Sequence, residues 1–73
     1  MKGSIQMEKR IYYVEWRYFG EKEVHRHIYR DITWKDVFLY AQYAQQNLIE
    51  FSFEDITDQP IEEFERRVNP NGV

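Results

Sequence analysis

The stretch Ile11-Tyr12-Tyr13-Val14-Glu15-Trp16-Arg17-Tyr18-Phe19 decides the fold expected for this 73-residue chain. It contains neither Gly nor Pro, and seven of its nine residues are β-branched or aromatic, the types that suit a pleated strand. Successive strand side chains point to opposite faces of a sheet. One face receives an apolar row made of Tyr12, Val14, Trp16 and Tyr18, and the other receives a mixed row. We therefore predict a central strand whose first row faces the core and whose second face is partly covered or used for contact.

Length and composition restrict the chain to one small domain. A single core of this size supplies roughly 3–5 kcal/mol of stability. There is no Cys, which excludes disulfides and thiolate metal ligands. Two Trp, six Tyr and five Phe offer compensation, since each aromatic side chain can bury a large area.

A hairpin is expected to follow the central strand. Residues 20–22 supply a turn, and residues 23–30 have the pattern of a second strand. A three-residue loop sets Val14 opposite Ile28, so that both face the core. We favour this register because the two-residue alternative places two arginines directly opposite each other, which is destabilising.

The rest of the chain predicts a helix, a strand and a second helix. A capping box of Thr33 and Asp36 opens a helix that runs to about residue 47. Its apolar stripe comprises Trp34, Val37, Phe38, Ala41, Ala44, Gln45 and Leu48. Residues 48–56 alternate as a half-buried strand. Asp58 or Gln59 then caps a short helix that starts near Pro60.

These elements predict an α+β fold with topology β-β-α-β-α. The sheet has three antiparallel strands in the order 2-1-3, with the main helix packed on one face and a short C-terminal helix. Residues 1–6 are expected to be a flexible N-terminus or an expression remnant. Residues 7–68 form the single domain, and residues 69–73 are expected to fray.

Charge is unevenly distributed along the chain, whose net charge is −3. Residues 1–35 are net basic, whereas seven acidic residues fall between Glu50 and Glu65. This asymmetry predicts an acidic region that attracts a partner protein with a basic surface, and that could mimic the phosphate track of a nucleic acid.

We therefore expect a small protein–protein interaction module, acting as a regulator or inhibitor. Exposed helix residues provide apolar anchors, because aromatic residues concentrate at binding hot spots. The expected partner-binding residues are Leu39, Tyr40, Tyr43, Glu54, Asp55, Asp58, Glu62 and Glu63. Small accessory proteins of phages and other mobile elements often have this form, and such an origin is an expectation from size alone.

The alternative function is binding of single-stranded nucleic acid on a sheet face. Such binders stack bases on aromatic rings while cations follow the phosphates. The residues that would do so here are Tyr13, Arg17, His25, His27 and Tyr29. The negative net charge and the absence of an RNP1-like motif count against it. A homodimer that closes an open sheet face is a third possibility.

Catalysis, metals and cofactors find little support in the sequence. There is no Gly-rich phosphate loop and no Cys nucleophile. His25 and His27 with Glu15 would resemble a metal site in the favoured register, but two exposed histidines are the simpler interpretation, and we predict neither metal nor cofactor. No run approaches the about 20 apolar residues of a membrane span. With no export signal and no Cys, a cytoplasmic location is expected.

Overall fold

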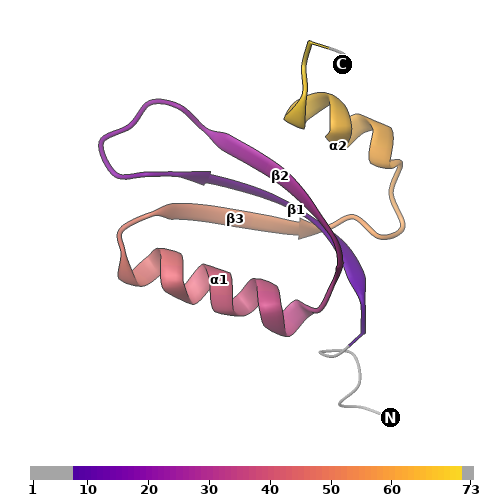
Figure 1. Cartoon of the computed structure of the whole chain (residues 1–73), viewed down its shortest axis with the longest axis horizontal. Coiled ribbons are helices and arrows are strands. Elements are labelled where there is room, and N and C mark those ends of the chain that lie inside the picture. Colours follow the sequence, from indigo (N-terminus) through magenta and orange to yellow (C-terminus); the bar gives the residue numbers. More distant parts are fainter. Residues whose placement is uncertain (1–7, 72–73) are drawn as a thin grey trace.

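The computed structural model describes residues 8–71. The elements in chain order are β1 (Arg10–Arg17), β2 (His25–Ile32), α1 (Trp34–Gln46), β3 (Glu50–Asp55) and α2 (Ile61–Val68). The strands form one antiparallel sheet in the order β2-β1-β3 (Figure 1), which confirms the predicted fold class and topology. The expectations for residues 1–6 and for residues 72–73 lie outside the described residues.

The predicted hairpin register is wrong by one residue. Strand β1 pairs Trp16 with His25 and Val14 with His27, not with Ile28. Because side chains alternate along a strand, this shift moves every β2 side chain to the other face. The two histidines therefore lie beside the apolar row of β1, and Ile28 lies on the opposite face.

A loop longer than expected causes this shift. Seven residues, 18–24, separate the two strands. The loop begins with a β-turn in which the Glu21 N–H donates to the Tyr18 carbonyl at 3.0 Å, and Gly20 has φ +86°. That positive φ at the third turn position is typical of a type II turn and suits Gly. The resulting register also brings Arg26 within 3.4 Å of Glu15, so the observed pairing is favourable electrostatically.

The two helices cover opposite faces of the sheet. On the α2 side, a core cluster of Tyr13, Ile56 and Phe64 is extended by Ile11, Ile28 and Ile61. On the α1 side, the buried side chains are Tyr12, Val14, Val37 and Ala44. The second row of β1, expected to be only partly covered, thus supplies part of a core through Tyr13. Each face has a small core of its own.

The start of α1 is as predicted. The Thr33 hydroxyl accepts from the Asp36 N–H at 3.2 Å, and the Asp36 carboxylate accepts from the Thr33 N–H at 3.4 Å. These reciprocal bonds satisfy two N–H groups that the helix itself leaves unpaired.

The buried face of α1 differs from the predicted stripe. Val37 and Ala44 are buried, but Phe38 and Gln45 are exposed and Leu48 lies beyond the helix end. The helix is rotated so that Tyr40 leans toward the sheet, where its ring lies 5.5 Å from that of Tyr29. The helical periodicity identified an apolar stripe on α1 but did not show which side of that stripe packs against the sheet.

The cap expected for α2 is also wrong. Pro60 occupies the N-cap position, and no side chain caps the helix. Gln59 is engaged elsewhere, since its side-chain amide donates to the Glu54 carboxylate at 3.1 Å and to the Asp55 carbonyl at 3.4 Å. The first turn of α2 is acidic and its last turn is basic, an arrangement that the helix dipole stabilises.

Candidate functional site

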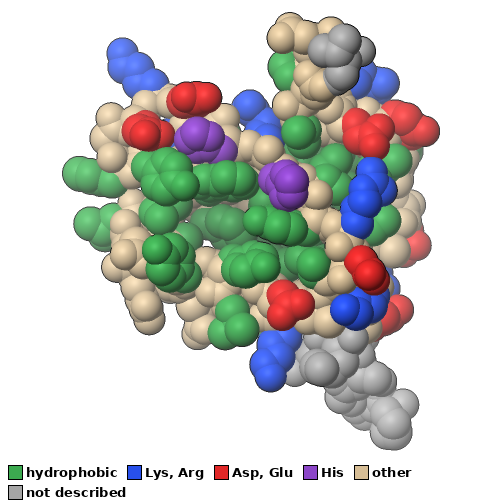
Figure 2. All heavy atoms as spheres, in the orientation of Figure 1, with side chains coloured by type: hydrophobic (Ala, Val, Ile, Leu, Met, Phe, Trp, Pro, Cys, Tyr) green, Lys and Arg blue, Asp and Glu red, His purple; other side chains and the backbone are tan. Residues whose placement is uncertain are grey.

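An open groove lies on the α1 side of the sheet. It holds about 250 Å³ and is hereafter the aromatic groove. Its lining comes from all three strands or their ends and from α1, and comprises Trp16, Tyr18, Tyr29, Tyr40, Tyr43, Ala44, Ile49 and Phe51. Figure 2 shows hydrophobic side chains gathered over this face, with a hollow between the sheet and α1.

The groove is open because α1 covers only part of the sheet. The helix buries Val37 and the small Ala44, so larger side chains beside Ala44 are left partly uncovered. Tyr40 is 42% exposed and Tyr43 is 64% exposed. These half-covered rings form the helix wall of the groove.

The hairpin wall of the groove is ordered by ring stacking. The Trp16 indole stacks on the His25 imidazole, with centroids 5.5 Å apart and planes at 23°. Tyr18 meets the same imidazole edge-on at 5.4 Å. Both contacts depend on the observed register, because only that register sets His25 directly opposite Trp16.

Among the described residues, none of the side chains that line the groove carries a charge. Arg17, the adjacent cation of β1, points to the other face and forms a two-point ion pair with Glu50 at 2.6 and 3.0 Å. An apolar cavity of about 150 Å³ already accommodates a benzene ring. The groove therefore suits an aromatic or aliphatic side chain rather than an ionic group.

The structure places the predicted helix anchors in two different settings. Tyr40 and Tyr43 line the aromatic groove. Leu39 is exposed but is not part of the groove lining, since a helical step of 100° per residue turns it away from Val37. Trp16, Tyr18, Tyr29, Ile49 and Phe51 complete the groove. Of these residues, Trp16 and Tyr18 were predicted to lie in the core. The high aromatic content was a signal against this, because a core this small cannot bury so many aromatic side chains and some of them must be exposed.

The acidic half of the chain is partly neutralised by the basic half. Because β3 pairs with β1, Asp55 meets Arg10 at 2.7 Å and Glu50 meets Arg17. Glu65 of α2 similarly meets Arg30 at 3.0 Å. The uneven charge along the sequence is thus reduced in space.

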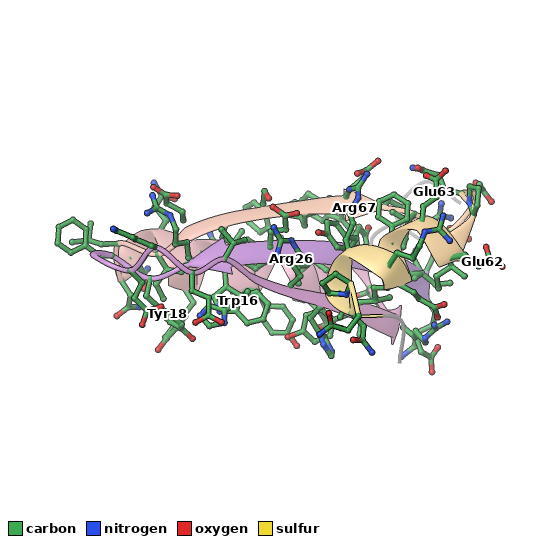
Figure 3. All side chains as sticks on the ribbon, turned by 90° about the horizontal axis from the view of Figure 1, so that it is seen from above. Trp16, Tyr18, Arg26, Glu62, Glu63 and Arg67 are labelled. Atoms are coloured by element: carbon green, nitrogen blue, oxygen red, sulfur yellow. The ribbon has the colours of Figure 1, made fainter. Side chains whose placement is uncertain are left out.

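Four acidic residues of the segment have no ion-pair partner among the described residues: Glu54, Asp58, Glu62 and Glu63. Figure 3 shows Glu62 and Glu63 at the end of the molecule far from Trp16 and Tyr18. Glu62 and Glu63 therefore lie apart from the groove that contains Tyr40 and Tyr43.

The ion pair of Asp55 gives a pH-dependent prediction. Partial burial disfavours the Asp55 carboxylate, but hydrogen bonds from the Thr57 hydroxyl and N–H and from Arg10 outweigh it and lower the pKa of Asp55. Because the pKa of Asp55 is lower in the folded state, its ionised carboxylate stabilises the fold at pH values above the unfolded-state pKa. This stabilisation is lost as pH falls through the folded-state pKa.

Asp55→Asn should therefore lower the free energy of unfolding by about 0.5–1 kcal/mol at pH 7, because the pair is partly exposed. The difference between wild type and variant should shrink as pH falls below the ordinary Asp value of 3.8 and through the lowered pKa of Asp55, so that it is smaller at about pH 2 than at pH 7. Urea unfolding at both pH values measures it. Glu63→Gln, which removes an exposed carboxylate that forms no ion pair among residues 8–71, is the matched control. Equal losses at both pH values in Asp55→Asn contradict the prediction.

The residues proposed for nucleic-acid binding do not share a face. Tyr13 is buried against Phe64, with ring centroids 5.2 Å apart, and Arg17 lies on the same side as Tyr13. His25, His27 and Tyr29 lie on the opposite face, beside Trp16. The predicted aromatic and basic platform is therefore wrong as a single surface, and Figure 3 shows Trp16 and Tyr18 on one side with Arg26 on the other.

The register also separates the residues considered for metal binding. Glu15 lies opposite Arg26, on the face away from His25 and His27. Within residues 8–71, no group of three or more His, Cys, Asp or Glu side chains is arranged to hold a metal ion. Within the same residues, no helix has both the length and the apolar character needed to cross a bilayer.

Comparison with protein families, with curated proteins and with solved structures found no significant match to this chain.

Proposed function

We propose that this chain is a small protein–protein interaction module, a regulator or inhibitor, that docks to a partner protein through the aromatic groove. The observation that carries the proposal is the concentration of partly exposed Tyr and Trp side chains around an uncharged hollow. Tyr and Trp are enriched at binding hot spots because they bury large areas at little conformational cost.

The chain around the groove supports a protein partner rather than a nucleic acid. Residues 37–49 contain no charged side chain, although 32% of the whole sequence is charged. A single-stranded nucleic acid needs cations that follow its phosphates as well as rings that stack on its bases. Among the residues that the structure describes, no Lys or Arg lines the groove, and the neighbouring Arg17 pairs with Glu50 on the other face.

The unpaired carboxylates have a separate role in the proposal. Asp58, Glu62 and Glu63 lie near the start of α2, remote from the groove. Exposed carboxylates raise the association rate with a basic partner more than they raise affinity. They steer a basic surface of the partner, while the groove supplies most of the binding energy. The module acts without catalysing a reaction.

Site-specific photo-crosslinking tests this function. A photoreactive residue at Tyr43 reports the groove, and the same residue at exposed Lys35, also on α1, is the matched control. We expect protein adducts from cell extract at Tyr43 and several-fold fewer at Lys35. Tyr40→Ala in the Tyr43-labelled chain should reduce the adducts, because it removes a groove wall.

Two outcomes contradict the proposal. Adducts that disappear after nuclease treatment, instead of after protease treatment, show that the groove binds nucleic acid. Equal labelling at Tyr43 and Lys35 shows that the groove is not a binding site. Glu62→Gln with Glu63→Gln tests the steering role, since it should slow association at low salt and have little effect at high salt.

A further inference from the structure

The most exposed large hydrophobic side chains lie at one end of the molecule. Phe19 is 83% exposed, Leu48 is 70% exposed, and Tyr43 follows at 64%. Phe19 belongs to the loop between β1 and β2, and the other two lie at or just after the C-terminal end of α1. Figure 1 shows this loop and this helix end at the same end of the fold. We call Tyr18, Phe19, Tyr43 and Leu48 the apolar end.

The backbone conformation matters at two of these residues, and at Leu48 it is unusual. Phe19 precedes Gly20 at the tip of a turn that needs the positive φ of Gly20. Leu48 itself has φ +59°, a conformation that is unfavourable for a residue with a Cβ and that usually belongs to Gly after a helix.

The helix end is well defined around Leu48. The Ile49 N–H donates to the Ala44 carbonyl at 2.8 Å, and the Asn47 side-chain amide donates to the Tyr43 carbonyl at 2.8 Å. Leu48 therefore combines a strained backbone with an exposed apolar side chain. Local strain of this kind is often retained where a residue has a functional contact.

The exposed side chains of the apolar end lie next to the aromatic groove. The apolar end projects Phe19 and Leu48, and it adjoins the aromatic groove, whose lining includes Tyr18 and Tyr43. The groove holds about 250 Å³, which is more than the roughly 150 Å³ that accommodates one aromatic ring. A surface that offers complementary features on one patch is suited to a two-fold contact with itself.

Charge at this surface allows a second copy of this chain as the occupant. A chain of net charge −3 repels itself in general. At this surface the repulsion is weak, because the groove lining and residues 37–49 are uncharged. The loop beside Phe19 carries both signs, Lys22 next to Glu23, and Glu21 lies 3.4 Å from His25. Within residues 8–71, the groove lining contains no carboxylate that could pair with a strongly basic partner, so the groove does not select for such a partner.

The exposed apolar area is close to what a dimer requires. From the exposed fractions and the roughly 150–250 Å² that an aromatic side chain can bury, the apolar end and the groove walls offer on the order of 600–700 Å² per copy. A standard specific interface buries about 800 Å² per partner. This area lies toward the low end of specific interfaces, which favours a reversible dimer over a permanent one.

We infer that the protein forms a two-fold symmetric homodimer in which the apolar end of each copy enters the aromatic groove of the other. The inference rests on the proposed function, since it names a second copy of this chain as the protein that occupies the groove, and a basic protein steered by the carboxylates is then a separate partner. The dimer leaves the carboxylates of α2 at the outer ends, where they remain available to a basic protein.

Sedimentation velocity of the full chain tests the dimer over concentrations of about 1–500 µM. The weight-average mass should rise from that of the 9.1 kDa monomer toward twice that value. Phe19→Ser and Leu48→Gly should each raise the dissociation constant at least tenfold. Val68→Ser changes a side chain on α2 that is 36% exposed and should leave the constant unchanged.

Leu48→Gly separates a loss of contact from a loss of folding. Gly relieves the positive φ, so the variant should melt at a higher temperature than wild type at low concentration, where monomers dominate. Weaker association together with a more stable monomer is a combination that a merely structural role of Leu48 does not produce.

A monomer at every concentration overturns the dimer, and so does a dimer that neither Phe19→Ser nor Leu48→Gly weakens. The proposed function is judged separately, since a monomer whose Tyr43 probe crosslinks a different protein retains the groove as a docking site. A monomer with no protein adduct at Tyr43 removes both.

Discussion

Phe64→Ala should lower the free energy of unfolding by about 3–5 kcal/mol, the usual loss for a buried Phe. Phe64 is 2% exposed and packs on Tyr13 and Ile56, while the Arg67 guanidinium lies 4.6 Å from its ring centroid. A domain of this size has about 3–5 kcal/mol of stability in all. The variant is therefore expected to be largely unfolded at 25 °C.

Far-UV circular dichroism with urea titration measures this effect. Arg66→Ala changes an exposed residue of the same helix and should stay within about 0.5 kcal/mol of wild type. Phe64→Leu keeps an apolar side chain at the site and should lose less than Phe64→Ala. A loss of under about 1 kcal/mol for Phe64→Ala would show that α2 is not docked on the sheet.

Local patterns predicted the elements of the fold well. The two strands β1 and β3 and the capping box of Thr33 and Asp36 were predicted from residues close in sequence, and the structure has each of them, although β3 is mostly exposed and not half-buried as predicted. The order of the strands followed from the two-sided character of β1, because a strand with apolar residues on both faces belongs in the middle.

The hairpin register could not be predicted by the same means. It depends on the conformation of the loop around Gly20, where a change of one residue exchanges the two faces of β2. This single difference set His25 beside Trp16, separated Tyr13 from His27, and brought Arg26 to Glu15. The nucleic-acid platform expected from the sequence depended on the other register.

The aromatic groove was only partly predictable for a related reason. Tyr40 and Tyr43 were identified because they lie off the apolar stripe of α1. Trp16 and Tyr18 were assigned to the core because their row on β1 is wholly apolar, yet alternation gives the face of a residue and not how much of that face a helix covers. Coverage depends on how α1 sits on the sheet, with Ala44 as its contact near the groove.

The spatial pairing of charges was likewise not visible in the sequence. Arg10 and Asp55 are 45 residues apart, and they meet because β3 lies antiparallel beside β1. Long-range ion pairs of this kind turn an acidic segment of the sequence into a surface with fewer free carboxylates. Among the described residues, Glu54, Asp58, Glu62 and Glu63 remain without an ion pair as candidates for steering a partner.

Helix α1 packs on the sheet through few buried side chains, so a substitution at one of them should strongly affect stability. Val37→Ala should lower the free energy of unfolding by about 2–3 kcal/mol, because two buried methyl groups are lost and a cavity remains. Val37 is 0% exposed, and Ala44 is the only other buried residue described for α1. A 13-residue helix has little stability of its own in water, so its position depends on these contacts.

Hydrogen exchange should show where the stability of Val37→Ala is lost. Amides of α1 should exchange at least tenfold faster than in wild type, with a smaller change in α2, which packs on the other face of the sheet. Leu39→Ala is the matched control, since Leu39 is exposed on the same helix and its loss should cost under about 0.5 kcal/mol. Equal effects of the two substitutions would mean that α1 is not held through its Val37 face, and the groove beside it would then lack a fixed wall.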